Sequence, residues 1–260
     1  MSNALSDFSM DFFSLKGKVA IVTGGNTGIG QGYAVALAKA GADLLVSTRN
    51  NDWDETRQLV EATGAKISFI QGDLTNADFR EAVIAECVKV YGRVDILVNN
   101  AGNIKRGPLL EHPYADYASI IEINLNAVFH LSQLAAQIME KQGGGKIINV
   151  ASMLSFQGGK FVPGYTASKH GVAGITKAFA NELACKNIQI NAIAPGYIES
   201  ANTAPIRADE NRSSEILSRI PAGHWGKPFD LMGTVVFLAS RASDYINGHI
   251  LAVDGGWLVR

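Results

Sequence analysis

A tyrosine, a lysine and a serine stand at spacings that suit proton-transfer chemistry. Tyr165 and Lys169 are four residues apart, and Ser152 precedes Tyr165 by 13 residues. Residues i and i+4 share one face of a helix, so we expect the Lys169 ammonium beside the Tyr165 phenol. A free phenol has a pKa of about 10, and a nearby positive charge favours its ionised form. The trio therefore predicts that Tyr165 exchanges a proton with a substrate oxygen that Ser152 holds.

A glycine-rich turn near the N-terminus suits the phosphates of a dinucleotide. It follows the apolar run 18–22, and a helical pattern begins at Gly30. At a strand-to-helix turn, bare backbone lets a pyrophosphate approach the positive end of the helix. The spacing is T-G-x-x-x-G-x-G rather than the commoner G-x-G-x-x-G, and a tight loop without a ligand is the alternative. The predicted cofactor contacts in this turn are Thr23, Gly24, Asn26, Thr27, Gly28, Ile29 and Gly30.

The ends of the third and fourth predicted strands carry further candidates for the cofactor. A carboxylate at Asp73 could accept a hydrogen bond from an adenine amine. The alternative for Asp73 is a turn residue, with Asn76 as the cap of the next helix. Small residues after the fourth strand would let a cofactor lie against the backbone. The candidates at these two strand ends are Asp73, Leu74, Asn100, Ala101 and Gly102.

The end of the second predicted strand bears on the choice between NAD(H) and NADP(H). An acid there would accept a hydrogen bond from the ribose 2′-hydroxyl. This strand ends instead in Thr48 and Arg49, and an arginine admits a 2′-phosphate on charge grounds. Asp52 and Asp54 dilute that positive field, and the alternative for Arg49 is a side chain in solvent. Both cofactors therefore stay open.

Strand and helix patterns alternate along the chain, as in a parallel sheet with helices on both faces. The strands are almost continuous runs of Val, Ile and Leu, which is typical of burial on both sides. The predicted strands are 18–23, 43–48, 67–71, 94–99, 146–151, 188–193 and 250–253, and the predicted helices are 30–40, 77–91, 123–141, 166–185 and 229–240. We therefore expect an α/β fold with one doubly wound parallel sheet of about seven strands.

No Pro- or Ser-rich linker divides the chain, so we expect one catalytic domain over 15–260 after an N-terminal extension, 1–14. The polar, helical segment 201–220 interrupts the alternation just past a strand end. Ligands bind beyond the carboxyl ends of strands in such sheets, so we predict a lid near 197–225. A solvated surface insertion is the alternative.

The bulk composition excludes several classes of protein. The 260 residues carry a formal net charge of -1, and no basic run suggests nucleic acid. No apolar stretch approaches the roughly 20 residues that span a bilayer, and the N-terminus lacks the cationic start of a signal peptide. Cys87 and Cys185 have no metal-ligand spacing, and the scattered histidines predict no metal site. Two cysteines read as reduced thiols, which is typical of a cytoplasmic protein.

From about residue 15 to 260, the chain resembles the short-chain dehydrogenase/reductase family. The shared motifs are T-G-x-x-x-G-I-G at 23–30, N-N-A-G at 99–102, Asn124, Ser152, Y-x-x-x-K at 165–169, P-G at 195–196 and V-D-G-G at 253–256. The resemblance implies a Rossmann fold, NAD(H) or NADP(H), and a homotetramer built on helices near 123–141 and 165–184. The predicted catalytic residues are Ser152, Tyr165, Lys169 and Asn124, and the remaining cofactor contacts are Tyr165, Lys169, Pro195, Gly196 and Ile198. Asn124 could hold a water between Lys169 and solvent, with a helix cap as the alternative.

A narrower resemblance is to the bacterial 2-dehydro-3-deoxy-D-gluconate 5-dehydrogenases, also called 2-deoxy-D-gluconate 3-dehydrogenases. It rests on segments 151–159, 207–210, 220–226 and 254–258, although His224 stands where that group more often has arginine. This resemblance implies reversible oxidation of a hydroxyl on a keto-deoxy sugar acid in uronate breakdown. The alternatives are a gluconate 5-dehydrogenase, a 3-oxoacyl-carrier-protein reductase and an inactive dinucleotide-binding regulator. The intact Ser152, Tyr165 and Lys169 argue against the last.

A sugar acid needs a partner for its carboxylate, and arginine binds carboxylates through two parallel hydrogen bonds. For any single cation, a solvated surface charge is the alternative. Residues next to Ser152 are placed to line the pocket. The candidates are Lys105, Arg106, Arg207 and Arg212 for the carboxylate, and Met153 and Gln157 for the pocket wall.

Overall fold

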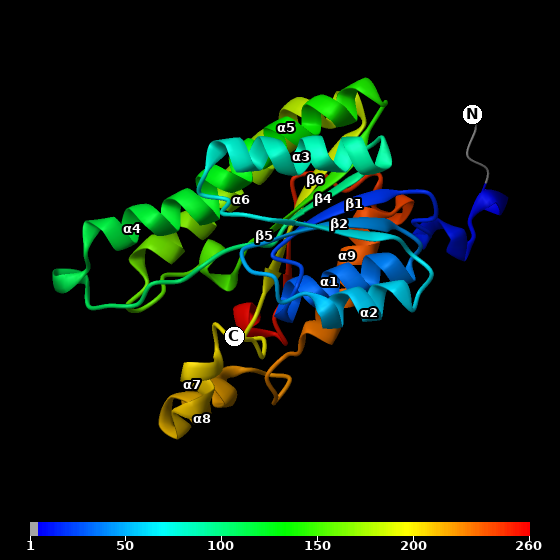
Figure 1. Cartoon of the computed structure of the whole chain (residues 1–260). Helices are drawn as coiled ribbons and strands as arrows, with labels where there is room; N and C mark the ends of the chain where they lie inside the picture. Colours follow the sequence, from blue (N-terminus) through cyan, green and yellow to red (C-terminus); the bar gives the residue numbers. More distant parts are fainter. Residues whose placement is uncertain (1–4) are drawn as a thin grey trace.

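The computed structural model describes residues 5–260 and contains one parallel sheet of seven strands. The strand order is β3-β2-β1-β4-β5-β6-β7, so the chain starts in the middle and winds outward in both directions (Figure 1). The strands are β1 (Val19–Thr23), β2 (Asp43–Thr48), β3 (Ile67–Gln71), β4 (Ile96–Asn99), β5 (Gly145–Val150), β6 (Ile188–Pro195) and β7 (Ile250–Val253). The predicted fold class is confirmed.

Helices cover both faces of the sheet (Figure 1). On one face lie α1 (Gly28–Lys39), α2 (Asp54–Glu61) and α9 (Met232–Ala239), and on the other lie α3 (Ala77–Tyr91), α5 (Ala127–Lys141) and α6 (Pro163–Leu183). Side chains alternate across a strand, so each strand feeds two cores. In β1, Ala20 and Val22 join the core under α1 and α9, whereas Val19 and Ile21 join the core under α3 and α5.

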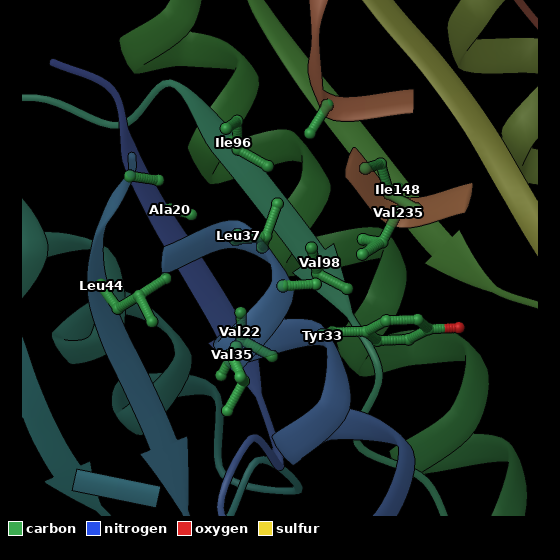
Figure 2. Close-up of a cluster of buried hydrophobic side chains, with 14 of the residues drawn as sticks. Ala20, Val22, Tyr33, Val35, Leu37, Leu44, Ile96, Val98, Ile148 and Val235 are labelled. Carbon is green, nitrogen blue, oxygen red and sulfur yellow. The ribbon is translucent and has the colours of Figure 1, made fainter. Parts of the chain in front are cut away.

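The core under α1 shows why the strands are apolar throughout (Figure 2). Ile96 and Val98 of β4 and Ile148 of β5 face Leu37 of α1 and Val235 of α9 there. Burying one such side chain contributes roughly 1.5–3 kcal/mol, so the sheet is a stiff base for residues at its edge. A strand with apolar side chains on one face only would fill one of these two cores and place polar side chains in the other.

Most element bounds were predicted to within two residues, and the differences have local causes. α2 and α4 (Tyr114–Ile121) were not predicted, because each has only eight residues, which is short for a helical pattern to be recognised. The predicted helix over 123–141 begins instead at Ala127, after a π-helical turn, Glu122–Asn126, that continues α4. The predicted strand over 94–99 is shortened to β4, and β6 runs two residues further than predicted.

Two helices stand apart from the layers, where the lid was predicted. α7 (Ala204–Ala208) and α8 (Glu210–Arg219) project beside the C-terminus (Figure 1). Within α8, Ile216 alone is buried, and it packs with Ile220, Met153 and Trp257. We call residues 197–225 the lid segment below. Whether this segment moves stays a prediction.

The N-terminal extension packs on the α9 side of the fold. The described part forms two 3₁₀ turns, Leu5–Asp7 and Met10–Phe13, and the Arg241 guanidinium lies 4.6 Å from the ring centre of Phe12. Residues 1–4 of the predicted extension lie outside the described residues. Over 5–260, no helix combines the length and apolarity that crossing a membrane requires.

Candidate active site

The carboxyl ends of the parallel strands bring the predicted catalytic residues to one edge of the sheet. Ser152 follows β5 by two residues, and Tyr165 and Lys169 lie in the first two turns of α6. The backbone N–H of Leu154 donates to Ser152 Oγ over 3.2 Å, which fixes the serine as the cap of a short 3₁₀ turn. Pro163 occupies the start of α6, where its missing N–H costs nothing.

Burial raises the pKa of the Tyr165 phenol above its usual range, while the nearby Ser152 hydroxyl and then the positive charge of Arg106 lower it. That Lys169 lowers the phenol pKa stays a prediction, although the Tyr165 pKa as a whole lies above its usual range. The Lys169 ammonium donates to the carbonyl of Val150 over 2.6 Å and lies 5.4 Å from the centre of the Tyr165 ring. It therefore faces the ring of Tyr165 while it is bound to the end of β5.

Lys169 is itself perturbed. The residue is 5% exposed, and burial lowers the pKa of its ammonium to about 8. A lysine with a pKa near neutrality can release and regain a proton easily. The i, i+4 spacing thus places the residue as predicted, but its electrostatic state depends on burial that no local pattern shows.

Asn124 lies in the middle of a continuous helical segment, so the prediction that it starts a helix is wrong. It sits in the π-helical turn, and its side chain is buried. Asn124 Oδ1 accepts from the Asn103 N–H over 2.8 Å, and Nδ2 donates to the Asn103 carbonyl over 2.9 Å. Nδ2 also donates to Ser168 Oγ over 3.2 Å. Asn124 therefore ties the loop after β4 to the helix that carries Lys169.

The turn after β1 has the shape that a pyrophosphate requires. Gly24 and Gly28 have φ of 62° and 56°, a left-handed conformation that favours glycine. A Cβ on Gly30 would run into the carbonyl oxygen of Gly24, so α1 approaches the loop closely. Thr27, the N-cap of α1, does not cap the helix with its side chain. Helix amides beside bare backbone are a ready anion site, so these residues fit a dinucleotide.

Thr23 and Asn100 lock the loops after β1 and β4 together. Thr23 Oγ1 accepts from the N–H groups of Asn100 and Ala101, over 3.0 and 2.9 Å. Asn100 Nδ2 donates to the carbonyls of Thr23 and Gly24, over 2.9 and 3.1 Å. The two side chains thus set the shape of the cradle, and a direct contact with a cofactor stays a prediction.

The loop after β2 is braced against the glycine-rich turn. Asn26 Nδ2 donates to Asn50 Oδ1 over 3.0 Å and to the Asp52 carbonyl over 2.9 Å. Thr48 Oγ1 donates to the Asn50 carbonyl over 2.6 Å. Arg49 is exposed at the end of β2 and lies near enough to Asp73 to lower the pKa of that carboxyl, so its guanidinium is accessible to a phosphate.

Asp73 lies where an adenine amine was predicted, but it also builds a turn. One carboxylate oxygen accepts from the N–H and the hydroxyl of Thr75, over 2.8 and 2.9 Å. These hydrogen bonds, and then the charge of Arg49, hold the Asp73 pKa below its usual range. Asn76 caps α3, as predicted. Both readings of Asp73 are compatible with this geometry.

The other predicted cofactor residues are buried or closely packed against neighbouring residues. Leu74 and Ile198 are 6% and 4% exposed and pack into the two cores, so only their backbones could meet a cofactor. Gly196 lies against Asp254, where a Cβ would approach the Asp254 Cα to 2.5 Å. Pro195 ends β6. A Cβ on Gly102 would lie 3.0 Å from Asn124 Oδ1, so this glycine allows the loop to pass close to the helix.

Of the four cations predicted for a substrate carboxylate, the structure brings Arg106 to the site. Arg106 is close enough to lower the Tyr165 pKa, and its guanidinium donates to the Asn202 carbonyl of the lid segment over 2.9 Å. The other three pair with acids: Lys105 with Asp116, Arg207 with Glu199 and Arg212 with Glu215. Arg207 is thus drawn away from a substrate role in this conformation.

Aromatic residues that were not predicted as site residues pack beside Met153, next to Ser152. Tyr197 meets the rings of Trp225 and Trp257 edge-on, at centroid distances of 5.3 and 4.8 Å. Trp257 also packs with Met153, and its indole nitrogen donates to Gln157 Oε1 over 3.0 Å. Trp257 directly follows the V-D-G-G motif, but a lone aromatic residue near a chain end gives no local sign of what it contacts.

Comparison with known proteins places this site in a family. A family model described as enoyl-(acyl carrier protein) reductase matches residues 24–258. The 2-dehydro-3-deoxy-D-gluconate 5-dehydrogenase of Bacillus subtilis (strain 168) is 57% identical over 250 residues, which cover 96% of this chain and 98% of the relative.

Solved structures agree with the sequence relatives. The NADP-bound structure of a candidate 2-deoxy-D-gluconate 3-dehydrogenase from Agrobacterium tumefaciens has a TM-score of 0.89 and 49% identity, covering 95% of this chain and 99% of that one. A gluconate 5-dehydrogenase from Burkholderia cenocepacia J2315, in complex with NADP and tartrate, has a TM-score of 0.92 and 36% identity, covering 96% and 98%. The chain therefore belongs to the short-chain dehydrogenase/reductase family, whose members are NAD(P)-dependent oxidoreductases.

Proposed function

We propose that this protein interconverts a hydroxyl and a ketone on a keto-deoxy sugar acid, with 2-dehydro-3-deoxy-D-gluconate as the substrate and C5 as the reacting carbon. The observation that supports the chemistry is the meeting of Ser152, Tyr165 and Lys169 at the sheet edge beside the glycine-rich turn. The observation that supports the substrate is 57% identity to a 2-dehydro-3-deoxy-D-gluconate 5-dehydrogenase over almost the full length of both chains.

In this proposal, the protein's own groups handle the proton and the oxygen. The Tyr165 hydroxyl gives a proton to the carbonyl oxygen during reduction and removes it from the alcohol during oxidation. Ser152 donates a hydrogen bond to the same oxygen as negative charge develops. Hydride transfer at the substrate carbon is the chemistry that a bound nicotinamide supplies.

Lys169 stabilises charge on Tyr165, and Asn124 holds the helix that carries both residues. The Lys169 ammonium has a lowered pKa and lies against the Tyr165 ring, so it can stabilise negative charge on the phenol and pass on a proton. The bonds of Asn124 to Asn103 and Ser168 hold the α6 helix in register with the loop after β4. The predicted water beside Asn124 remains part of the proposal.

For the cofactor, we propose that the chain accepts NADP(H). Thr23, Asn100 and the glycine-rich turn would hold the pyrophosphate, and Arg49 would meet the 2′-phosphate. Two relatives with known structures hold NADP, which supports this assignment. The amine of an adenine ring would lie near Asp73.

A panel of substrates and both cofactors tests the proposal. We expect the purified protein to oxidise 2-dehydro-3-deoxy-D-gluconate with NAD(P)⁺ and to reduce the resulting 5-ketone with NAD(P)H. With NAD(P)H, we expect kcat/KM for neutral keto sugars and 3-oxoacyl thioesters to be at least about a hundredfold lower than for that ketone. A preference for 5-keto-gluconate would assign a gluconate 5-dehydrogenase, and a preference for thioesters an acyl-carrier-protein reductase. Cofactor binding without turnover of any substrate would leave a dinucleotide-binding regulator.

We further propose a homotetramer in the cytoplasm. The two cysteines are free, with Cys87 buried and Cys185 exposed, as expected of a reducing compartment. Phe129 of α5 is 42% exposed and packs against Phe179 of α6, which supports an interface on the helices that the family resemblance predicts for a tetramer. Light scattering on wild-type protein and on Phe129→Asp tests this assembly, because a charge at a tetramer interface should yield smaller species.

A further inference from the structure

A hydrogen bond from the C-terminal segment holds the side chain of Gln157, which was predicted to line the substrate pocket, in one orientation. Trp257 Nε1 donates to Gln157 Oε1 over 3.0 Å, although the two residues are 100 positions apart in the chain. Gln157 lies five residues after Ser152, and its N–H donates to the Met153 carbonyl over 3.1 Å. The Gln157 side chain therefore belongs to the same loop as Ser152.

The chemistry of the partner decides which end of the Gln157 amide is which. An indole nitrogen can only donate, so the atom that faces it must be the amide oxygen. The two N–H donors of Nε2 then point away from Trp257, and none of the described residues accepts a hydrogen bond from them. Gln157 is partly exposed, so these donors are open to a ligand.

Trp257 is held firmly enough to impose this orientation. The residue is 5% exposed, and the Arg219 guanidinium of α8 lies 4.0 Å from its ring centre. The Asp254 carboxylate accepts from the N–H groups of Gly256 and Leu258, each over 2.9 Å, which fixes the turn that presents the indole.

Steric contacts explain why two glycines occupy that turn. Gly255 and Gly256 have φ of 64° and 88°. A Cβ on Gly255 would lie 3.0 Å from Ile220, and one on Gly256 would lie 3.0 Å from Pro221. The turn is therefore pressed against the end of the lid segment, and the indole is wedged between the lid segment and the Ser152 loop.

We propose that Gln157 contacts the substrate as a hydrogen-bond donor only, and that Trp257 is the positioning residue that makes it one. The amide then selects an oxygen acceptor on the substrate, either the carboxylate or a keto or hydroxyl oxygen, and rejects a donor such as an ammonium group. This inference rests on the proposed function for the identity of the substrate, but the orientation of the amide does not depend on it.

Gln157→Glu is the decisive variant. A glutamate accepts the Trp257 hydrogen bond as well as glutamine does, so the fold is preserved, but it offers the substrate an acceptor and a negative charge. For 2-dehydro-3-deoxy-D-gluconate we expect KM to rise at least about 30-fold, kcat to change less than about threefold and the urea midpoint to stay unchanged. The same KM as in the wild type would overturn the proposal.

Trp257→Phe tests the positioning role. It keeps an aromatic ring but removes the indole donor, so the amide can rotate, and we expect KM to rise about three- to tenfold. Trp53→Phe is the matched control, because Trp53 stacks on Phe69, with 5.0 Å between the ring centres, and makes no hydrogen bond to Gln157. In a Gln157→Ala background, Trp257→Phe should leave KM where Gln157→Ala alone puts it. An equal further rise in that background would show that Trp257 acts without Gln157.

A substrate analogue that lacks the carboxylate identifies the oxygen. If the Gln157→Glu penalty vanishes with the analogue, the amide contacts the carboxylate; if it persists, the amide contacts a keto or hydroxyl oxygen. Wild-type protein that is inactive on 2-dehydro-3-deoxy-D-gluconate would refute the proposed function alone. The same variants would then be compared on the keto substrate that the panel selects, where an unchanged KM in Gln157→Glu would again overturn the donor role.

Discussion

The cofactor half and the substrate half of the edge are built in different ways. Around the glycine-rich turn, buried strands are joined by hydrogen bonds to backbone groups, such as Gly24 N–H to the Ser47 carbonyl over 2.8 Å and the bonds between Thr23 and Asn100. The lid segment is held by exposed side chains, such as Arg106 on the Asn202 carbonyl and Arg260 on the Ser218 carbonyl. Rigid backbone thus shapes one half, and single side chains shape the other.

This difference explains why cofactor and substrate leave such unequal traces in the sequence. A phosphate is read by backbone N–H groups at a helix N-terminus, which demands glycines at fixed spacing. A sugar acid is read by side chains that converge from distant segments, and many combinations would serve. Ligand-binding lids are also drawn from the less stable parts of a fold. Variants on either side of Tyr165 should therefore affect cofactor binding and substrate binding separately.

Tyr165→Phe should have the largest effect, because it removes the hydroxyl that exchanges a proton with the substrate. We expect kcat to fall about 10²–10⁴-fold, the range of general acid–base catalysis, while the Kd of NADPH stays within twofold. Steady-state assays and a fluorescence titration measure the two quantities. Tyr245→Phe is the matched control, because Tyr245 is fully exposed. Appreciable turnover in Tyr165→Phe would rule out the proposed proton donor.

Arg49→Ala should affect the cofactor half alone. Hydrogen bonds to charged groups contribute about 1.5–3 kcal/mol, so we expect the Kd of NADPH to rise roughly 10- to 100-fold and the Kd of NADH to stay unchanged. Arg57→Ala is the control, since Arg57 lies over the Phe69 ring, 5.2 Å from its centre. Equal weakening of both cofactors would mean that Arg49 supports the loop rather than a 2′-phosphate.

Lys169→Met should trade activity for stability. Burial lowers the pKa of the Lys169 ammonium to about 8, whereas the unfolded chain keeps it near 10.4. Below pH 8 the native state therefore holds an unfavourable buried charge, which penalises folding by up to about 3 kcal/mol. Above pH 8 the native state has lost this proton, and the unfolded state still binds it. The penalty therefore shrinks as pH rises toward 10.4, where the unfolded state also loses the proton.

Methionine removes that charge but also the hydrogen bond to the Val150 carbonyl, which contributes about 1 kcal/mol. We expect Lys169→Met to unfold at higher urea than the wild type at pH 6.5, with a gain of about 1–2 kcal/mol. At pH 10 the gain should be gone. If the variant is less stable than the wild type at pH 6.5, contacts within the native site must offset the cost of burying the Lys169 ammonium.

The sequence predicted the sheet better than it predicted the site, and the reason is range. β2, β3, β7 and α3 have their predicted bounds, because a short apolar run, or a helix between an Asn cap and a Gly, carries its signal within a few residues. The Ser152, Tyr165 and Lys169 trio was found because strand ends and i, i+4 spacing are also local. The π-helical turn was missed, since it is stabilised by Asn124 bonds to Asn103, 21 residues away.

The electrostatics and the pocket wall could not be read from any local pattern. Burial raises the Tyr165 pKa, and burial depends on how helices pack over the site. Trp257 reaches Gln157 across 100 residues of sequence, so neither residue signals the other. Arg106 and Arg207 look alike in the sequence, and only the fold gives Arg207 an acidic partner, Glu199.

Arg106→Gln should have the smallest effect, and it separates two roles that meet in the substrate half. Glutamine can still donate to the Asn202 carbonyl, but it carries no charge. The positive charge of Arg106 lowers the Tyr165 pKa, so its loss raises that pKa and leaves less phenolate to act as the base in oxidation. Exposed charges contribute about 0.2–1 kcal/mol, so we expect kcat for oxidation at pH 7 to fall two- to fivefold.

Because the defect is one of ionisation, the Arg106→Gln oxidation rate should recover at higher pH, and Arg106→Lys should keep the wild-type pH profile. A loss that is the same at every pH would assign Arg106 to the lid contact instead, since a missing hydrogen bond to Asn202 does not titrate. A large rise in KM with no change in pH profile would assign it to the substrate carboxylate. Each pattern gives the guanidinium one of three partners, because Tyr165, Asn202 and a bound acid respond differently to pH and to substrate concentration.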